Sequence, residues 1–205
     1  MTLDGLGMEI LASAEADKLE RFQSIALKWN EKINLVSPVS AAEFWERHIV
    51  DSVQVFHVKQ DWTGHYVDLG SGGGLPGLVC SILKRSRQMD GPITLVESDT
   101  RKATFLRTVN RELELEVVVV ARRIEVIEKL NADILTARAL APLPTLLGFA
   151  QQHLSDTGAA LFPKGASWQE EVTDAQTLWS FDLKTHQSHT NPDSRILEIE
   201  GISRV

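Results

Sequence analysis

One glycine-rich segment constrains the fold of this 205-residue chain more than any other feature. Residues 67–77 read Val-Asp-Leu-Gly-Ser-Gly-Gly-Gly-Leu-Pro-Gly, the pattern of a buried strand that runs into a loop and then a helix. Glycines at positions 70, 72 and 74 permit positive φ and let the backbone approach a ligand where a Cβ would collide. In open α/β sheets, cofactors bind beyond the carboxyl ends of the strands. The segment therefore predicts an α/β fold with a cofactor at this loop.

Short apolar segments alternate with helical or loop segments from His65 onward. We expect strands at residues 66–69, 93–97, 116–120, 133–137 and 159–163. Such alternation is typical of a parallel sheet with helices on both faces. Two further runs, at 181–187 and 195–200, flank a turn-rich segment and predict an antiparallel hairpin that closes one edge of the sheet.

The first sixty residues carry a helical pattern instead. Apolar residues between Leu19 and Ile33 recur at steps of three and four, and a second segment, 41–58, repeats this spacing after a break at Pro38. A chain of this length with 43% hydrophobic residues builds one substantial core. We therefore expect a helical N-terminal extension over residues 1–60 and an α/β domain over residues 61–205, which together form one compact unit.

Composition narrows the location and the partners. The first ten residues carry an acid where a signal peptide would be basic, and no apolar run is long enough to span a bilayer, so we expect a cytoplasmic protein without membrane contact. The single cysteine, Cys80, excludes an internal disulfide, and the histidines lack metal-ligand spacing, so we predict no metal. A net charge of −7 argues against broad nucleic-acid binding but allows a local basic patch. The candidates for this patch are Arg101, Lys102, Arg107, Arg111, Arg122, Arg123, Arg138 and Lys164.

The spacing of the glycines distinguishes between cofactors. A dinucleotide fingerprint needs glycine at its first, third and sixth places, but counting from Gly70 puts Leu75 at the sixth. A nicotinamide-dependent oxidoreductase is therefore disfavoured. An acid two residues before Gly-x-Gly-x-Gly, here Asp68, instead resembles the first motif of class I methyltransferases, which bind S-adenosylmethionine. Glu97, at the end of the second strand, is then placed to accept hydrogen bonds from ribose hydroxyls.

Several motifs in order along the chain carry a more specific resemblance. They are Lys-Trp-Asn at 28–30 with Asn-Leu at 34–35, Arg-His-Ile-Val-Asp-Ser at 47–52, the loop at 68–77, Arg-Lys at 101–102 with Phe-Leu-Arg at 105–107, Arg-Ile-Glu at 123–125, Ala-Arg-Ala at 137–139 and Lys-Gly at 164–165. Together they resemble the glucose-inhibited division protein B family, the small-subunit ribosomal RNA guanine-N7 methyltransferases. Gly73 departs from that family's pattern, in which proline is frequent at this place. Residues after about 166 carry no recognisable motif.

The resemblance implies a class I, Rossmann-like methyltransferase sheet and S-adenosylmethionine as cofactor. Asp68 with Gly70, Gly72 and Gly74 would form the cofactor loop, with Gly70 and Leu75 on the methionine and ribose side. Ile124 and Glu125 would flank the adenine, and Arg138 would close the site after the fourth strand. The substrate would be a guanine in the 530 loop of 16S ribosomal RNA, in free RNA or in the small subunit, and the enzyme is expected to be a monomer.

The same resemblance predicts that Arg123, Arg138 and Lys164 face the RNA. His48 stands three residues before Asp51, so the two side chains can meet across one helical turn and shape an RNA-facing or cofactor-facing surface; a purely structural place on the helix face is the alternative.

The chemistry of guanine N7 fits this set of residues. N7 bears an exposed lone pair and needs no general base, so positioning can carry the reaction, with Arg138 and Arg123 as orienting groups. A pyrimidine-C5 enzyme needs a cysteine nucleophile, but Cys80 lies in an apolar helical stretch and is expected to be buried. A noncatalytic RNA-binding or ribosome-assembly protein of the same fold, and a methyltransferase with another RNA acceptor, remain alternatives.

Overall fold

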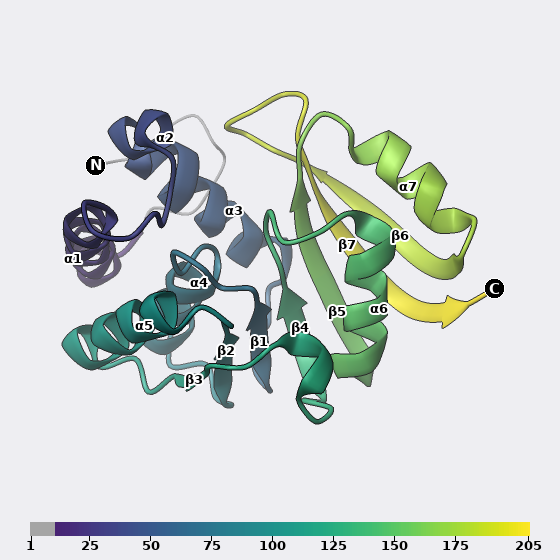
Figure 1. The fold of residues 1–205 in the computed structure, drawn as a ribbon, viewed down its shortest axis with the longest axis horizontal. Helices are drawn as coiled ribbons and strands as arrows, with labels where there is room; N and C mark the ends of the chain where they lie inside the picture. Colours follow the sequence, from purple (N-terminus) through teal and green to yellow (C-terminus); the bar gives the residue numbers. More distant parts are fainter. Residues whose placement is uncertain (1–10) are drawn as a thin grey trace.

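The computed structural model of the chain describes residues 11–205, so the first ten residues, on which the signal-peptide argument rests, lie outside the described residues. Its centre is a seven-stranded sheet in the order β3-β2-β1-β4-β5-β7-β6 (Figure 1). The strands are β1 (Tyr66–Leu69), β2 (Ile93–Val96), β3 (Val118–Val120), β4 (Ala132–Thr136), β5 (Leu154–Lys164), β6 (Trp179–Gln187) and β7 (Arg195–Arg204). The first five are parallel, whereas β7 runs antiparallel to both β5 and β6. The predicted α/β sheet with a C-terminal hairpin is confirmed.

Helices cover both faces of this sheet. They are α1 (Ser13–Asn30), α2 (Pro38–Ala42), the π-helical turn η1 (Trp45–Val50), α3 (Asp51–Val58), α4 (Gly77–Ser86), α5 (Thr100–Leu113), the 3-10 turn η2 (Ile124–Val126), α6 (Leu143–His153) and α7 (Trp168–Gln176). Figure 1 shows α4 and α5 beside β1–β3, and α6 and α7 beside β4–β7. None of the helices among residues 11–205 is both long and apolar enough to cross a membrane.

Two hydrophobic clusters lie on the two faces of the sheet, because successive strand residues point to opposite sides. In β1, Tyr66 belongs to the cluster under α4 and α5, whereas Val67 belongs to the cluster under α6 and α7. All four residues of β1 and of β2 are buried, as expected for parallel strands covered on both faces.

The described N-terminal helices share the first of these clusters. Leu19, Phe22 and Ala26 of α1 are fully buried, and α1 packs against α4 and α5. The ring of Trp29 lies 5.7 Å from that of Phe105. The division of the chain at residue 60 stays a prediction.

The predicted continuous helix over 41–58 is wrong in one respect. The structure interrupts it with the π-helical turn η1 before α3 begins at Asp51. Side chains bond to carbonyls of this turn: Arg138 Nη1 lies 3.5 Å from Arg47 O, and Ser52 Oγ donates to His48 O at 2.6 Å. A π-helical turn is often found at functional sites, and this one positions His48.

Candidate functional site

The glycine loop after β1 has the backbone geometry that the sequence predicts. Gly70, Gly72 and Gly74 have φ of +66°, +50° and +78°. A Cβ on Gly70 would lie 2.6 Å from Leu140 Cδ1, and one on Gly74 would overlap Leu78, whose Cγ would be 2.8 Å away. A Cβ on Gly72 would meet no protein atom closer than 3.6 Å. Gly70 and Gly74 are therefore needed for packing, whereas Gly72 leaves open space above the loop.

Asp68 lies beneath this loop. Its carboxylate is fully buried, and Thr136 Oγ1 donates to its Oδ1 at 2.5 Å. Burial raises the pKa of Asp68 to about 6, and the hydrogen bond from Thr136 opposes this rise. Neither Asp68 nor Gly74 lines the three cavities described below. Asp68 thus supports the loop from below.

Glu97 ties the loop to the next turn. Its Oε2 accepts from the N–H of Gly72 at 2.8 Å, and its Oε1 accepts from the N–H of Asp99 at 2.7 Å. Asp99 in turn caps α5 by accepting from the N–H groups of Arg101 and Lys102. Glu97 is only 8% exposed and lines a cavity, and its two backbone donors fix the carboxylate at the edge of that cavity.

Two cavities share the backbone of Gly70 and Gly72. The first, of about 460 Å³, is lined by five predicted cofactor residues, namely Gly70, Gly72, Glu97, Ile124 and Glu125. Three basic residues, Lys102, Arg122 and Arg123, also line it. The second, of about 450 Å³, is lined by Leu75, Arg138 and His48, and by Leu35 from the segment after α1.

A third cavity, of about 590 Å³, lies beyond Arg138. It is lined by residues of α3, of the ends of β4 and β5, and of the segment before β7, including Asp51, Gln54, Arg138, Lys164, Ser188 and Arg195. Ala139 lines all three cavities and has φ of +52°, which is rare for a residue with a side chain. The segment that follows β4 is therefore the common wall of the three cavities.

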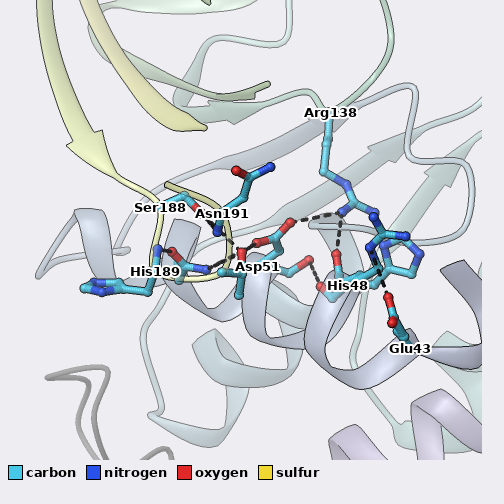
Figure 2. A network of polar contacts seen from close by, with 11 residues as sticks. Glu43, His48, Asp51, Arg138, Ser188, His189 and Asn191 are labelled. Carbon is cyan, nitrogen blue, oxygen red and sulfur yellow. Dashed lines mark hydrogen bonds and ion pairs between the residues drawn. The ribbon is translucent and has the colours of Figure 1, made fainter. Parts of the chain in front are cut away.

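Arg138 forms one side of a polar network that extends through Asp51 to the β6–β7 loop (Figure 2). Its Nη2 donates to His48 Nδ1 at 3.2 Å, and its Nη1 lies 4.0 Å from Asp51 Oδ2. Arg138 thus bridges the side chains of His48 and Asp51, in place of the direct contact that their spacing allowed. Desolvation, aided by the positive charge of Arg138, lowers the pKa of His48 to about 4. His48 is therefore neutral near pH 7.

The chain after residue 166, which carries no recognisable motif, also contributes to this site. The loop between β6 and β7 returns to α3, where the N–H of His189 donates to Gln54 Oε1 at 2.7 Å and Thr190 Oγ1 donates to Asp51 Oδ1. Gln54 Nε2 also donates to Asp51 Oδ1, at 3.2 Å. The available signal was the presence of polar Gln54 beside apolar Val53 and Val55 on a buried helix.

Lys164 is less exposed than its predicted RNA-facing role suggested. Its Nζ donates to Glu171 Oε2 at 2.7 Å and to Ala141 O at 2.9 Å, and the side chain is 10% exposed. Cys80 is buried, as predicted. Among residues 11–205, no group of histidine, cysteine and acidic side chains could hold a metal ion.

Comparison with known proteins identifies the family. The GidB family model, described as rRNA small subunit methyltransferase G, matches residues 15–196. The chain belongs to this family. It is 47% identical to the ribosomal RNA small subunit methyltransferase G of Ruegeria sp. (strain TM1040), over 98% of this chain and 99% of that protein. It is 46% identical to that of Paracoccus denitrificans (strain Pd 1222), over 93% of this chain and 97% of that protein.

Solved structures agree on the fold of this member of the methyltransferase G family. A TehB-like SAM-dependent methyltransferase from Corynebacterium glutamicum covers 89% of this chain and 98% of its own with a TM-score of 0.57 at 13% identity. The TYW2 protein of M. jannaschii, solved with AdoMet, covers 85% of this chain and 80% of its own with a TM-score of 0.56 at 12% identity. The family resemblance and the Rossmann-like fold are confirmed, and S-adenosylmethionine is the methyl donor of this family of enzymes.

Proposed function

We propose that this chain transfers a methyl group from S-adenosylmethionine to N7 of a guanine in the 530 loop of 16S ribosomal RNA. Its membership of the methyltransferase G family supports the reaction and the substrate class. The observation that carries the proposal is the meeting of a glycine-cradled cavity with a separate cavity lined by Asp51 and Arg138 at Ala139, because methyl transfer needs adjoining sites for donor and acceptor.

The residues around the glycine loop fit S-adenosylmethionine. The open space above Gly72 is one that a Cβ would enter, and the fixed carboxylate of Glu97 has further lone pairs that can accept from ribose hydroxyls. Ile124 and Glu125 would flank the adenine in the first cavity. Gly70, Leu75 and Arg138 would hold the methionine part in the second, while Asp68 and Gly74 would keep the loop in shape. When bound, the cofactor supplies an electrophilic methyl group on a sulfonium.

The protein's own part in the reaction is to orient the base and to keep the pocket from becoming too cationic. Guanine N7 attacks with its lone pair, so no general base is required, and Arg138 can donate to the neighbouring O6. Methylation at N7 leaves a positive charge on the purine, which further cations nearby would oppose. His48 is neutral, and Asp51 lies 4.0 Å from the guanidinium of Arg138. Both features support an orienting role for Arg138.

Four residues are proposed to face the RNA: Arg123, Arg138, Lys164 and His48. Arg123 is exposed and lines the first cavity, so it is suited to a phosphate or a base edge. Lys164 lines the third cavity, and it would have to contact RNA while keeping its ion pair with Glu171. We further propose that the enzyme works as a monomer in the cytoplasm, which sedimentation of the purified protein and fractionation of cells would test.

The deciding experiment is transfer of labelled methyl from S-adenosylmethionine to purified small ribosomal subunits and to stripped ribosomal RNA, followed by mapping of the product. A 7-methylguanine in the 530 loop is the expected result. A methylated nucleotide elsewhere would replace the proposed acceptor. Cofactor binding without transfer to either substrate would instead favour a noncatalytic RNA-binding role.

A further inference from the structure

The third cavity presents a guanidinium and a carboxylate side by side. Arg138 Nη1 lies 4.0 Å from Asp51 Oδ2, and the two side chains are 19% and 35% exposed. Figure 2 shows Asp51 between Arg138 on one side and the β6–β7 loop on the other. With a volume of about 590 Å³, the cavity lies within the size range of small-molecule sites.

The carboxylate of Asp51 is held so that its two oxygens differ. Oδ1 accepts from Gln54 Nε2 and from Thr190 Oγ1, whereas Oδ2 has, within residues 11–205, only the longer contact with Arg138. The backbone N–H of His189 fixes Gln54 in turn. A carboxylate can accept about four hydrogen bonds, so Oδ2 keeps capacity for a ligand.

Such a pair matches one purine and opposes the other. Guanine carries the acceptor O6 next to the donors N1–H and N2–H₂, whereas adenine carries a donor at N6 next to an acceptor at N1. A guanidinium can only donate and a carboxylate can only accept. A protein donor to O6 together with a protein acceptor for N1–H would hold guanine by its Watson–Crick edge, the edge that enzymes read in an unstacked base. N7 would then remain without a protein contact.

We propose that Asp51 determines the specificity for guanine, accepting hydrogen bonds from N1–H and N2–H₂ of the acceptor base while Arg138 donates to O6. Thr190 and Gln54 are positioning residues, because they act through the orientation of Asp51. This inference rests on the proposed function, and it gives the β6–β7 loop a role in choosing the base.

The test compares bases that differ on this edge alone. The unmodified chain and the Asp51→Asn variant are assayed on small-subunit RNA with guanosine, inosine or adenosine at the target position. Inosine keeps O6 and N1–H but lacks the N2 amino group. We expect the unmodified chain to prefer guanosine over inosine by about 10-fold, the lower end for a hydrogen-bonded base contact, and adenosine to be the poorest of the three. Asp51→Asn should lose about 100-fold in kcat/KM on guanosine, and its guanosine-to-inosine ratio should fall toward one.

Two further variants separate base reading from folding. Asp193→Asn changes an exposed acid on the same loop that lines none of the cavities, and it should leave the ratio unchanged. Thr190→Val keeps the side-chain shape but removes one donor to Asp51, and it should lower the ratio several-fold even if Asp51→Asn proves too unstable to assay. S-adenosylmethionine affinity should be the same in all of these variants.

An unchanged guanosine-to-inosine ratio in folded Asp51→Asn would overturn the inference while leaving the proposed function intact. The same result in Thr190→Val would remove the positioning role of the loop. Absence of any methyl transfer by the unmodified chain would overturn the proposed function, and this inference with it.

Discussion

The substitution Gly72→Ala separates the two demands that the loop makes on its glycines. At φ of +50°, an alanine carries a backbone penalty of about 1–2 kcal/mol. No steric penalty within the protein is added, because the nearest atom to the new Cβ would be 3.6 Å away. For a chain of this size, that loss corresponds to a fall in Tm of about 2–8 °C. The methyl group would instead enter the space proposed for the cofactor, so affinity for S-adenosylmethionine should fall at least about tenfold, which is ~1.4 kcal/mol.

Gly74→Ala is the matched comparison, since φ there is +78° and the backbone penalty is similar. Its Cβ would overlap the buried side chain of Leu78, which adds about 1–3 kcal/mol of overpacking. This variant should lose more stability than Gly72→Ala but keep the affinity of its folded fraction. Gly148→Ala, in α6, meets no atom closer than 3.7 Å and serves as a neutral control.

Urea unfolding and calorimetric titration with S-adenosylmethionine measure the two quantities separately. Wild-type affinity in a folded Gly72→Ala protein would refute the idea that the cofactor occupies the space above Gly72. A loss of stability as large as that of Gly74→Ala would refute the reading of the Cβ distances.

Three further predictions follow from single contacts. In Glu97→Gln, only the amide oxygen can accept, so the backbone N–H that bonds to the other carboxylate oxygen would face an NH₂ group, and this partly buried donor loses its partner at about 1–3 kcal/mol. Calorimetry should show weaker cofactor binding for this variant, whereas Glu128→Gln, at an exposed position, should bind the cofactor as the unmodified chain does. Lys164→Ala should spare cofactor affinity and weaken RNA methylation, and unchanged RNA turnover would remove its proposed RNA-facing role. The pKa of His48 is about 4 in the folded chain, against an ordinary value of 6.5, so on acidification the unfolded chain binds the proton first. The free energy of unfolding should therefore fall as the pH drops from about 6.5 to 4. The urea midpoint of His48→Gln should fall less over that range than the midpoint of the unmodified chain, and an equal fall in both proteins would contradict the lowered pKa.

The strands and the loop were predictable because their signals are local. Three of the four buried residues of β1, Tyr66, Val67 and Leu69, are apolar, and the glycines that follow mark positive φ at the positions where the structure has it. The bounds of β5 were less predictable: the strand begins at Leu154, five residues before the expected start. Near the start of this strand, Ser155, Asp156 and Thr157 are polar, and the register against β4 shifts there. No alternation of apolar and polar residues therefore marks this part of the chain as a strand.

The π-helical turn could not be read from periodicity. The apolar spacing continues from Trp45 through Phe56, as it would in an uninterrupted helix. What distinguishes this segment is its contact with Arg138, which is 91 residues from Arg47 in the sequence and bonds to its carbonyl. A pattern within one helix carries no information on a partner so distant.

The role of the β6–β7 loop illustrates a different limit, because topology predicts its place but not its contacts. A strand that runs antiparallel to its neighbour begins where that neighbour ends, and here Lys164 at the end of β5 pairs with Arg195 at the start of β7. The loop before β7 must therefore lie at the carboxyl edge of the parallel strands, which is where ligands bind in such sheets. The expected hairpin thus already implied that residues 188–194 border the cleft. That Thr190 and His189 meet Asp51 and Gln54 there depends on how α3 packs over the same edge, which only the three-dimensional arrangement reveals.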